Sequence, residues 1–289
     1  GPPRDRRGGA PVKLATIRTA SGTAAVRIEG EQAVEIGAAD VSELLQRDGW
    51  RGEAAAAASA RHQVADLVYA PLVPSPRKII CVGLNYRSHI LEMGRELPAY
   101  PTLFAKFANS LLGANDDIVL PGVSDQVDWE AELGVVIGTA LRRASPGQAA
   151  AAIAGYTIVN DISMRDWQWR TSEWLQGKTF EASTPVGPWL VTPDEVDAGR
   201  LDLHCDVDGD SRQRGNTSDL LFPPAEIAAY ISQFITLEPG DLIATGTPGG
   251  VGAGRDPKVF LQDGQTLTTA IDGLGQLRNT CVKESAGAR

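Results

Sequence analysis

The chain has 289 residues, enough for one large domain or two modest ones with a substantial core. It is 43% hydrophobic and 22% charged, as globular proteins are, and 27 basic against 36 acidic residues give a net charge of -9. This acidic balance, with no cluster of Lys and Arg, argues against a nucleic-acid partner. No apolar run is long enough to span a membrane, and no CxxC pair occurs among Cys81, Cys205 and Cys281. We therefore expect a cytoplasmic protein with reduced thiols and no membrane partner.

The first part of the chain predicts a small N-terminal α/β domain over residues 12–74. Residues 1–11 are partly basic with no apolar segment behind them, and we expect a disordered or tag-derived tail there. Pro71, Pro74 and Pro76 break the preceding helical pattern and predict a linker. The expected elements are two strands at 13–17 and 23–28 and one helix at 41–65, which holds the alanine run 54–58.

We expect a larger domain over residues 75–283, followed by a tail at 284–289. Short apolar stretches between Gly and Pro turns predict strands, whereas long helical patterns are few. This pattern is typical of an α+β domain dominated by β-strands, and not of a doubly wound sheet. The expected strands are 78–82, 118–120, 133–137, 155–159, 187–191, 201–207 and 241–245, and the expected helices are 145–154, 164–175 and 224–234.

Glu130 and Glu132 are the most informative residues of the chain because they lead into an apolar strand. Side chains alternate along a strand, so both carboxylates project from the same face. Neighbouring carboxylates repel each other, and a hard divalent cation such as Mg2+ relieves that repulsion. A strand whose solvent-facing side carries two acids explains the same pair without a metal.

Three familiar nucleotide-binding or hydrolase motifs are missing from the sequence. Gly177-Lys178-Thr179 lacks the upstream glycine of a phosphate-binding loop, because Ser172 stands in that place. The glycine-rich segment 246–252 does not have the spacing of a dinucleotide-binding loop. No serine lies in a G-x-S-x-G turn.

Of the three histidines, His89 is the candidate for catalysis, whereas His62, in the predicted helix, and His204, in a predicted strand, favour structural roles. If the chain turns helical after the strand that ends near residue 82, His89 and Glu92 are i,i+3 neighbours on one face. A carboxylate beside an imidazole orients it and raises its basicity, which suits a general base. Such a pair is also common by chance, so the spacing alone leaves a structural role open.

Five motifs that occur in order carry a resemblance to a known family. Together they resemble the fumarylacetoacetate hydrolase family in its shorter, acylpyruvate-hydrolase-like branch, over about residues 77–283. The N-terminal part resembles the small variable domain of many members. The five motifs are the segments 83–94, 129–138, 159–166, 177–183 and 237–252.

The resemblance implies a mixed β-roll fold, a homodimer and a set of site residues. Asn85 stands where the longer branch has an additional aspartate ligand, so three carboxylates are expected, completed by water or substrate. The implied metal is Mg2+, with Mn2+ as a substitute. The implied metal ligands are Glu130, Glu132 and Asp161; the catalytic residues are His89, Glu92 and Lys178; the substrate-binding residues are Thr247, Lys106 and Arg165, and Arg165 also fits a structural role.

The reaction implied first is hydrolysis of a C–C bond in an acylpyruvate-type β-diketo acid such as fumarylpyruvate. The metal stabilises the departing pyruvate enolate, and His89 with Glu92 activates water. Oxaloacetate decarboxylation and 2-oxo-acid isomerisation, tautomerisation or hydration use the same metal site and remain alternatives. A catalytically silent structural homologue is the alternative from another class. The position of residues 93–100, with Gly94 and Pro98 as hinges, suggests a lid.

Overall fold

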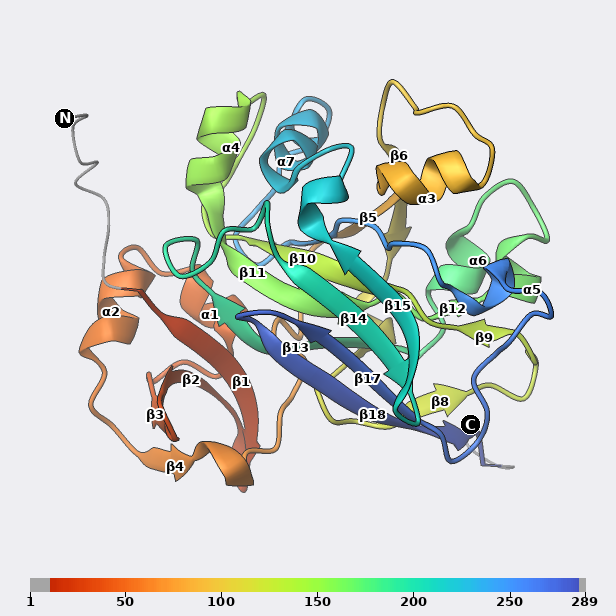
Figure 1. Ribbon diagram of the computed structural model, residues 1–289. Coiled ribbons are helices and arrows are strands. Elements are labelled where there is room, and N and C mark those ends of the chain that lie inside the picture. The colour runs from red at the N-terminus through yellow and green to blue at the C-terminus, as the bar shows by residue number, and fades with distance from the viewer. Residues whose placement is uncertain (1–10, 286–289) are drawn as a thin grey trace.

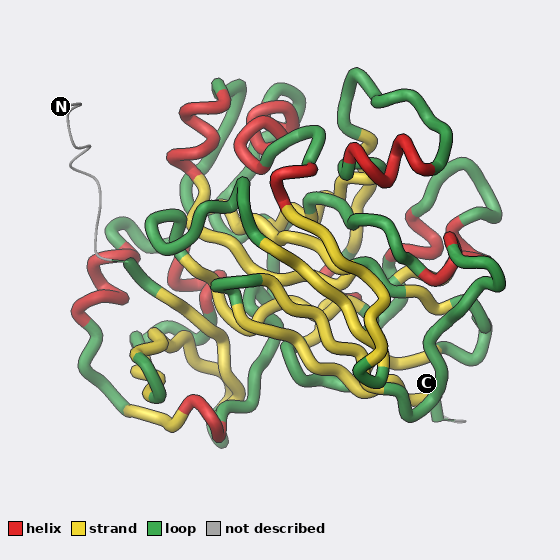
Figure 2. The backbone as a smooth tube through the Cα atoms, viewed as in Figure 1, coloured by secondary structure: helices red, strands yellow, loops and turns green. Residues whose placement is uncertain are grey.

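The computed structural model describes residues 11–285 (Figure 1). The tails predicted at 1–11 and 284–289 therefore lie outside the described residues, except for Pro11, Glu284 and Ser285. Strands form most of the regular structure, and the helices are short (Figure 2). The predicted strand-dominated α+β class is confirmed.

The largest sheet has eleven strands and runs through both the N-terminal part and the larger part of the chain. Antiparallel pairing of Lys13 with Val191 and of Leu14 with Leu190 joins the two parts. Strand β7 (Leu111–Leu112) pairs in parallel with β13 beside the main path. In spatial order, the other ten strands are β4 (Arg61–Gln63), β3 (Gln32–Glu35), β2 (Gly22–Glu29), β1 (Lys13–Thr19), β13 (Thr184–Val191), β11 (Ile153–Asn160), β10 (Ala131–Ile137), β16 (Leu242–Ala244), β5 (Ile79–Gly83) and β6 (Thr102–Lys106).

A second sheet of five strands packs against the centre of the first, and the main hydrophobic core lies between them (Figure 1). Strands β10 and β11 are buried along their whole length, which explains why they read as continuous apolar runs. The five strands in order are β15 (Asp210–Asn216), β14 (Asp202–Val207), β17 (Thr266–Ile271), β18 (Gly275–Lys283) and β8 (Ile118–Leu120), and a separate pair consists of β12 (Ser163–Met164) and β9 (Val127–Asp128).

The helices lie around the sheets, and α4 and α7 pack against each other (Figure 1). Helix α4 begins with a capping box in which Ser145 and Gln148 satisfy each other's backbone N–H groups. None of the helices in residues 11–285 is long and apolar enough to cross a membrane. The α-helices are α1 (Val41–Leu45), α2 (Trp50–Ala56), α3 (Arg87–Glu92), α4 (Pro146–Ala152), α5 (Arg165–Gln168), α6 (Leu175–Lys178) and α7 (Pro224–Ser232), and the 3-10 turns are η1 (Val64–Asp66), η2 (Ala108–Ser110), η3 (Thr217–Asp219) and η4 (Gly252–Gly254).

The helix predicted at 41–65 is wrong in its length. It is split into α1 and α2 at Gly49, which has a left-handed backbone (φ 75°), and residues 61–63 form strand β4 instead. The buried Arg27 guanidinium donates to the carbonyl oxygens of Ala55 at 2.7 Å and Ala57 at 3.1 Å. These bonds satisfy the end of α2, so tertiary contacts override the helix propensity of the alanine run. His62 consequently lies in a strand, where its Nε2 is 2.7 Å from Glu35 Oε1.

The helix predicted at 164–175 is also interrupted. Only α5 and α6 are helical, and a loop separates them. Within that loop the Thr171 hydroxyl bonds to both the N–H and the carbonyl of Glu173. This local side-chain bonding competes with the helical hydrogen bonds of the backbone.

The proline-containing segment predicted as a linker is fastened to the large sheet. Leu72 and Val73 are fully buried, and the Leu72 carbonyl accepts a bond from the Thr16 hydroxyl at 2.7 Å. The Leu72 N–H donates to Val186 O in β13 at 3.3 Å. The segment therefore contacts both the N-terminal strands and the larger part of the chain.

Candidate active site

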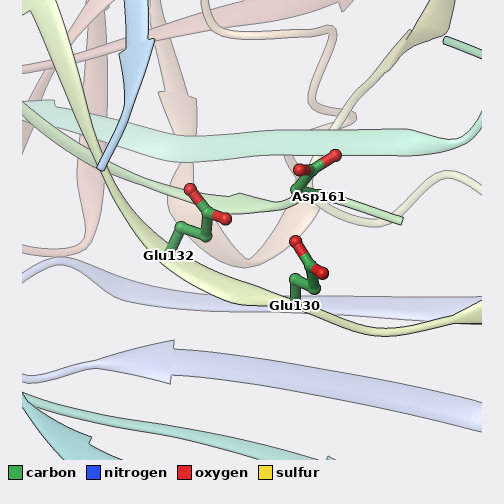
Figure 3. A group of neighbouring side chains, drawn as sticks. All are labelled: Glu130, Glu132 and Asp161. Atoms are coloured by element: carbon green, nitrogen blue, oxygen red, sulfur yellow. The ribbon is translucent and has the colours of Figure 1, made fainter. Parts of the chain in front are cut away.

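Three carboxylates converge at the ends of two neighbouring strands (Figure 3). Glu132 lies in β10 and Glu130 just before it, while Asp161 directly follows β11. The antiparallel register pairs Ala131 with Asn160, and the Asp161 N–H donates to Glu130 O at 2.8 Å. The carboxylate oxygens of the three residues lie within 4.8 Å of one another, so residues 31 positions apart form a single acidic triad.

Three buried cations surround this triad. The Lys178 ammonium donates to Glu130 Oε2 at 2.7 Å and to Asp161 Oδ2 at 2.8 Å. The Lys106 ammonium donates to Asp161 Oδ1 at 2.5 Å, and Arg165 Nη1 lies 2.7 Å from Glu130 Oε1. Burial alone would raise the pKa of Asp161, but Lys106 and Lys178 outweigh it and lower that pKa to about 2. Asp161 is therefore ionised at neutral pH.

Glu132 is the member of the triad with no cation within ion-pair distance among the described residues, although Lys178 attracts it from farther away. Its carboxylate is fully buried and accepts a bond from the Gly246 N–H at 2.8 Å. Burial raises the pKa of Glu132 well above its usual value, and repulsion from Asp161 and Glu130 raises it further. Gly246 has φ 103°, which a residue with a Cβ rarely adopts, so glycine is needed to present this N–H.

The charges around the triad fit a bound divalent cation. Asp128, also buried, accepts from Arg165 Nε at 2.9 Å, so four buried carboxylates face three buried cations. One carboxyl group is therefore left without a paired cation, and this group is Glu132, whose raised pKa reflects the cost of ionising it there. Carboxylate oxygens are the ligands that Mg2+ and Mn2+ prefer. A divalent cation would turn the local net charge positive, which suits an anionic ligand.

A cavity of about 420 Å³ opens onto the triad. Its wall combines the acidic residues with cations, aromatic side chains and the glycine-rich loop after β16. This mixture of apolar surface and a few convergent polar groups is typical of a small-molecule site. The lining residues that bear on the chemistry are His89, Glu92, Arg95, Glu130, Glu132, Arg165, Lys178, Thr247, Gly250 and Arg255.

His89 and Glu92 both reach the cavity from helix α3, one turn apart. A Cβ on Gly249 would lie 3.3 Å from His89 Nδ1 and 3.3 Å from Glu92 Oε2, so both side chains approach the glycine-rich loop. No hydrogen bond joins the two side chains within residues 11–285. Burial lowers the pKa of His89, and Glu92 opposes this shift by favouring the charged form. A pKa below 6.5 leaves His89 neutral at pH 7, as a general base requires.

Lys178 reaches the triad because α6 packs closely on the preceding turn. A Cβ on Gly177 would lie 2.4 Å from the backbone nitrogen of Gln168 and 2.5 Å from Met164 O. Glycine therefore allows a backbone approach that any other residue would block. Burial opposes the charged form of Lys178, but Asp161 and Glu130 outweigh it and raise the pKa of the ammonium. Lys178 stays protonated beside the triad.

Thr247 lines the cavity, but its hydroxyl is already engaged. The hydroxyl donates to Ala131 O at 2.9 Å and accepts from Gln213 Nε2 at 2.8 Å. In the described part of the chain, the backbone N–H groups of Thr247, Gly249 and Gly250 have no acceptor. Backbone N–H groups, not the hydroxyl, are therefore the donors that this loop offers to an anion.

Lys106 and Asn85 do not line the cavity and instead support the structure around it. The Lys106 side chain has no exposed surface, and its contacts are with Asp161 and the carbonyl of Ile162. Asn85 donates to the carbonyls of Phe222 and Thr245 and accepts from the Phe222 N–H, so its amide is used within the fold. Across residues 11–285 the acidic triad is the only group of three or more His, Cys, Asp or Glu residues placed to hold a metal.

Asp128, which was not among the predicted site residues, connects the triad to the glycine-rich loop. Its two oxygens accept from Gly252 N at 2.7 Å, from Ala253 N at 2.9 Å and from Arg165 Nε at 2.9 Å. Arg165 in turn contacts Glu130. An acidic residue two positions before Glu130 at the start of an apolar strand was the available signal, but its loop partners lie more than 120 residues away.

The strand-dominated fold brings a histidine and an acidic triad that could hold a divalent cation into one cavity, an arrangement typical of an enzyme active site. Residues 78–282 match the family described as "Fumarylacetoacetate (FAA) hydrolase C-terminal". The chain belongs to the fumarylacetoacetate hydrolase family, and the resemblance predicted from its motifs is confirmed. Members of this family generally bind a divalent metal, and the triad is a site that can hold one.

Known relatives and structures agree with this assignment. A putative hydrolase of Burkholderia ambifaria is 50% identical over 207 residues, 70% of this chain and 73% of the relative. The human mitochondrial oxaloacetate tautomerase FAHD2A is 45% identical over 213 residues, 73% of this chain and 68% of the relative. The crystal structure of a putative HpcE protein from Mycobacterium smegmatis has a TM-score of 0.86 at 34% identity, covering 94% of this chain and all of that one.

Proposed function

We propose that this protein is a Mg2+-dependent enzyme that enolises a 2-oxo acid, and that keto–enol tautomerisation of oxaloacetate is its leading reaction. The observation that carries the proposal is the acidic triad, with its uncompensated Glu132, in the same cavity as the neutral base His89. The 45% identity to the human oxaloacetate tautomerase supports the choice of substrate. Mn2+ is the expected substitute for Mg2+.

Glu130, Glu132 and Asp161 would hold the metal. When bound, the cation supplies a Lewis acid that polarises the 2-oxo group and favours the enolate. His89 would remove a proton from C3 of the keto form, and the resulting imidazolium would return that proton to the 2-oxo oxygen, directly or through water, to complete the enol and regenerate neutral His89. Lys178 stabilises negative charge at the same oxygen, and the N–H groups of the glycine-rich loop bind the carboxylate. No atom is gained or lost, as tautomerisation requires.

Hydrolysis of a C–C bond in acylpyruvates is the second candidate. It is favoured by the approach of His89 and Glu92 to the same loop, because a base oriented by a carboxylate suits activation of water. Purified protein with Mg2+ would be assayed against oxaloacetate for tautomerisation and decarboxylation, and against acetylpyruvate and fumarylpyruvate for hydrolysis. Tautomerisation of oxaloacetate as the fastest reaction is expected. Faster cleavage of an acylpyruvate would reverse the order of the two candidates.

The pH dependence of catalysis follows from the direction of the His89 shift. Only neutral imidazole accepts a proton, and burial lowers the pKa of His89 below its ordinary 6.5. With saturating Mg2+, kcat/KM is therefore expected to be nearly constant between pH 8 and pH 7 and to fall on acidification with a midpoint below 6.5. Initial rates across this range check it, and a midpoint above 6.5 would contradict the assignment.

Replacing Lys178 with methionine is expected to lower kcat by on the order of a hundredfold, as for loss of one donor to a developing oxyanion. The matched variant is Lys106→Met, because Lys106 contacts Asp161 but, unlike Lys178, does not line the cavity. Lys106→Met should weaken Mg2+ binding and thermal stability more than it lowers kcat at saturating Mg2+. Equal kcat losses in the two variants would show that Lys178 acts only by holding Asp161.

Other features remain predictions. A homodimer is expected, and light scattering of the purified protein would measure it. The segment 93–100 contributes Met93 and Arg95 to the cavity wall and is largely exposed, as a lid over His89 requires. The division into domains at residue 74 and the cytoplasmic location are further expectations.

A further inference from the structure

We propose that Arg255 recognises a second carboxylate of the substrate, which makes this an enzyme for dicarboxylic 2-oxo acids. The inference rests on the proposed function and adds to it the residue that selects the substrate. Arg255 lies in the cavity wall, immediately after turn η4 (Gly252–Gly254). Its partners in the protein and the atoms that it leaves free carry the inference.

Arg255 is held in place without being neutralised. Its Nη2 donates to Arg212 O at 2.7 Å and to Gly250 O at 3.2 Å, both backbone carbonyls. Within residues 11–285 no carboxylate lies within ion-pair distance of it, and its Nε is buried with no hydrogen-bond partner. The protein encloses this Nε, so the feature that points to a ligand is the positive charge beside the cavity, which no carboxylate of the described residues balances.

The two buried cations of the cavity wall differ from the half-buried Arg255 in this respect. Arg165 is bonded to Asp128 and Glu130, and Lys178 to Glu130 and Asp161. Carboxylates of the protein therefore balance both charges, and one of the three ammonium donors of Lys178 remains for a substrate oxygen. Arg255 has no such carboxylate in residues 11–285, and its Nη1 makes no hydrogen bond there, so a substrate carboxylate can pair with it.

The backbone that carries Arg255 is fixed relative to the triad. The N–H groups of Gly252 and Ala253 donate to the buried Asp128, which also bonds Arg165. The Arg255 N–H donates to Gly252 O at 3.2 Å. The guanidinium is thus positioned before substrate arrives, and little conformational freedom is lost when a carboxylate binds.

Arg95 is the second unpaired cation of the wall, but its position is different. It is exposed, lies in the segment 93–100 that we expect to form a lid, and has no ion-pair partner within residues 11–285. Water and salt screen an exposed charge more than a part-buried one. We therefore assign the recognition of the second carboxylate to Arg255 and expect a smaller contribution from Arg95.

The test compares oxaloacetate, which has a carboxylate beyond its metal-chelating end, with an anion that has none beyond that end. In Arg255→Met, KM for oxaloacetate should rise about tenfold to a hundredfold, as for loss of a charged hydrogen bond, with a smaller change in kcat. Both carboxylates of oxalate belong to its chelating end, so its affinity, measured by calorimetry with Mg2+, should change less than about threefold. Arg255→Lys keeps the positive charge but not the planar guanidinium, and its KM should fall between those of wild type and Arg255→Met.

Arg200→Met is the matched control, because Arg200 is exposed and lies outside the cavity wall. It should leave KM and oxalate affinity unchanged, and Arg95→Met should raise KM less than Arg255→Met does. If Arg255→Met does not fold, Arg255→Lys replaces it in the test, and a KM for oxaloacetate above the wild-type value is then the expected result. An unchanged KM, or equal losses of affinity for oxaloacetate and oxalate, would overturn the inference and leave the proposed function standing. A wild-type protein inactive on oxaloacetate would overturn both.

Discussion

Replacing Glu132 with glutamine is expected to lower metal-dependent activity to about one thousandth of the wild-type value, while leaving the fold intact. Glu132 offers a ligand oxygen to the triad, and it is the carboxyl group that no cation of the described residues pairs with, so a bound cation would stabilise its ionised form. The loss corresponds to the several kcal/mol that a bound cation supplies to a developing enolate. Calorimetric titration with Mg2+ at pH 7.5 should show much weaker binding, and tautomerisation of oxaloacetate gives the matching rate.

Although Glu132→Gln should lower activity, it should not lower the thermal stability of the metal-free protein. The pKa of Glu132 is raised in the folded state, so the folded protein binds this proton more tightly than the unfolded chain does. Metal-free wild type therefore loses stability as pH rises from about 4.5 through the folded pKa, and a glutamine cannot ionise. At pH 7.5 and without metal, Glu132→Gln should melt at or above the wild-type temperature.

With added Mg2+, wild type should instead melt at a higher temperature than Glu132→Gln. A ligand in hundredfold excess over its Kd stabilises the protein that binds it by about 2.7 kcal/mol, and only the wild type should gain this. Glu31→Gln is the matched control, because Glu31 is exposed and away from the site. The control should behave as wild type in both melting experiments. Undiminished Mg2+ affinity in Glu132→Gln would remove Glu132 from the ligand set.

Replacing His89 with alanine should lower the rate of enolisation about a hundredfold to ten-thousandfold, the usual range for loss of a general base. His89 is the histidine in the cavity wall, and its lowered pKa keeps it neutral at pH 7. Hydrolysis of an acylpyruvate should fall in the same range, because attack by water also needs a base. Any decarboxylation of oxaloacetate should fall much less, since it needs the enolate to be stabilised but no proton to be removed.

All of these rates can be measured on one preparation, with Mg2+ affinity determined in parallel. His204→Ala is the control, because His204 lies in β14 (Asp202–Val207) outside the cavity wall. It should change none of the rates. Equal losses of enolisation and decarboxylation in His89→Ala, with Mg2+ affinity retained, would mean that His89 positions the substrate. A wild-type rate of enolisation would exclude His89 as the base.

The local pattern of the sequence was sufficient for much of the central sheet. Strands β10 and β11 were predicted because their residues are buried on both faces and form unbroken apolar runs. Helix α3, which carries His89 and Glu92, follows strand β5, so the condition on which their i,i+3 pairing depended is met. The alternation of side chains along a strand also predicted that Glu130 and Glu132 share a face, as Figure 3 shows.

Local pattern failed where distant residues act on the backbone. The alanine run favours a long helix, but Arg27 binds the carbonyls at its end and stops it. Strands β3, β15, β17 and β18 were not predicted, and most of these alternate buried and exposed residues with few apolar runs. Such strands are stabilised by pairing with neighbours, which a single segment does not reveal.

The sequence by itself determined the chemical character of the site: two carboxylates on one strand face, a histidine with a nearby glutamate, and, through ordered motifs, the family. Only the tertiary structure decided how the charges are distributed. Strand register brings Asp161 beside Glu130, and Lys106, Lys178 and Arg165 then neutralise those two carboxylates and leave Glu132 without a cation. The same packing leaves Arg255 buried at Nε with no acceptor. Compensation of a charge depends on distances of a few ångströms between residues far apart in sequence, and these exist only in the folded chain.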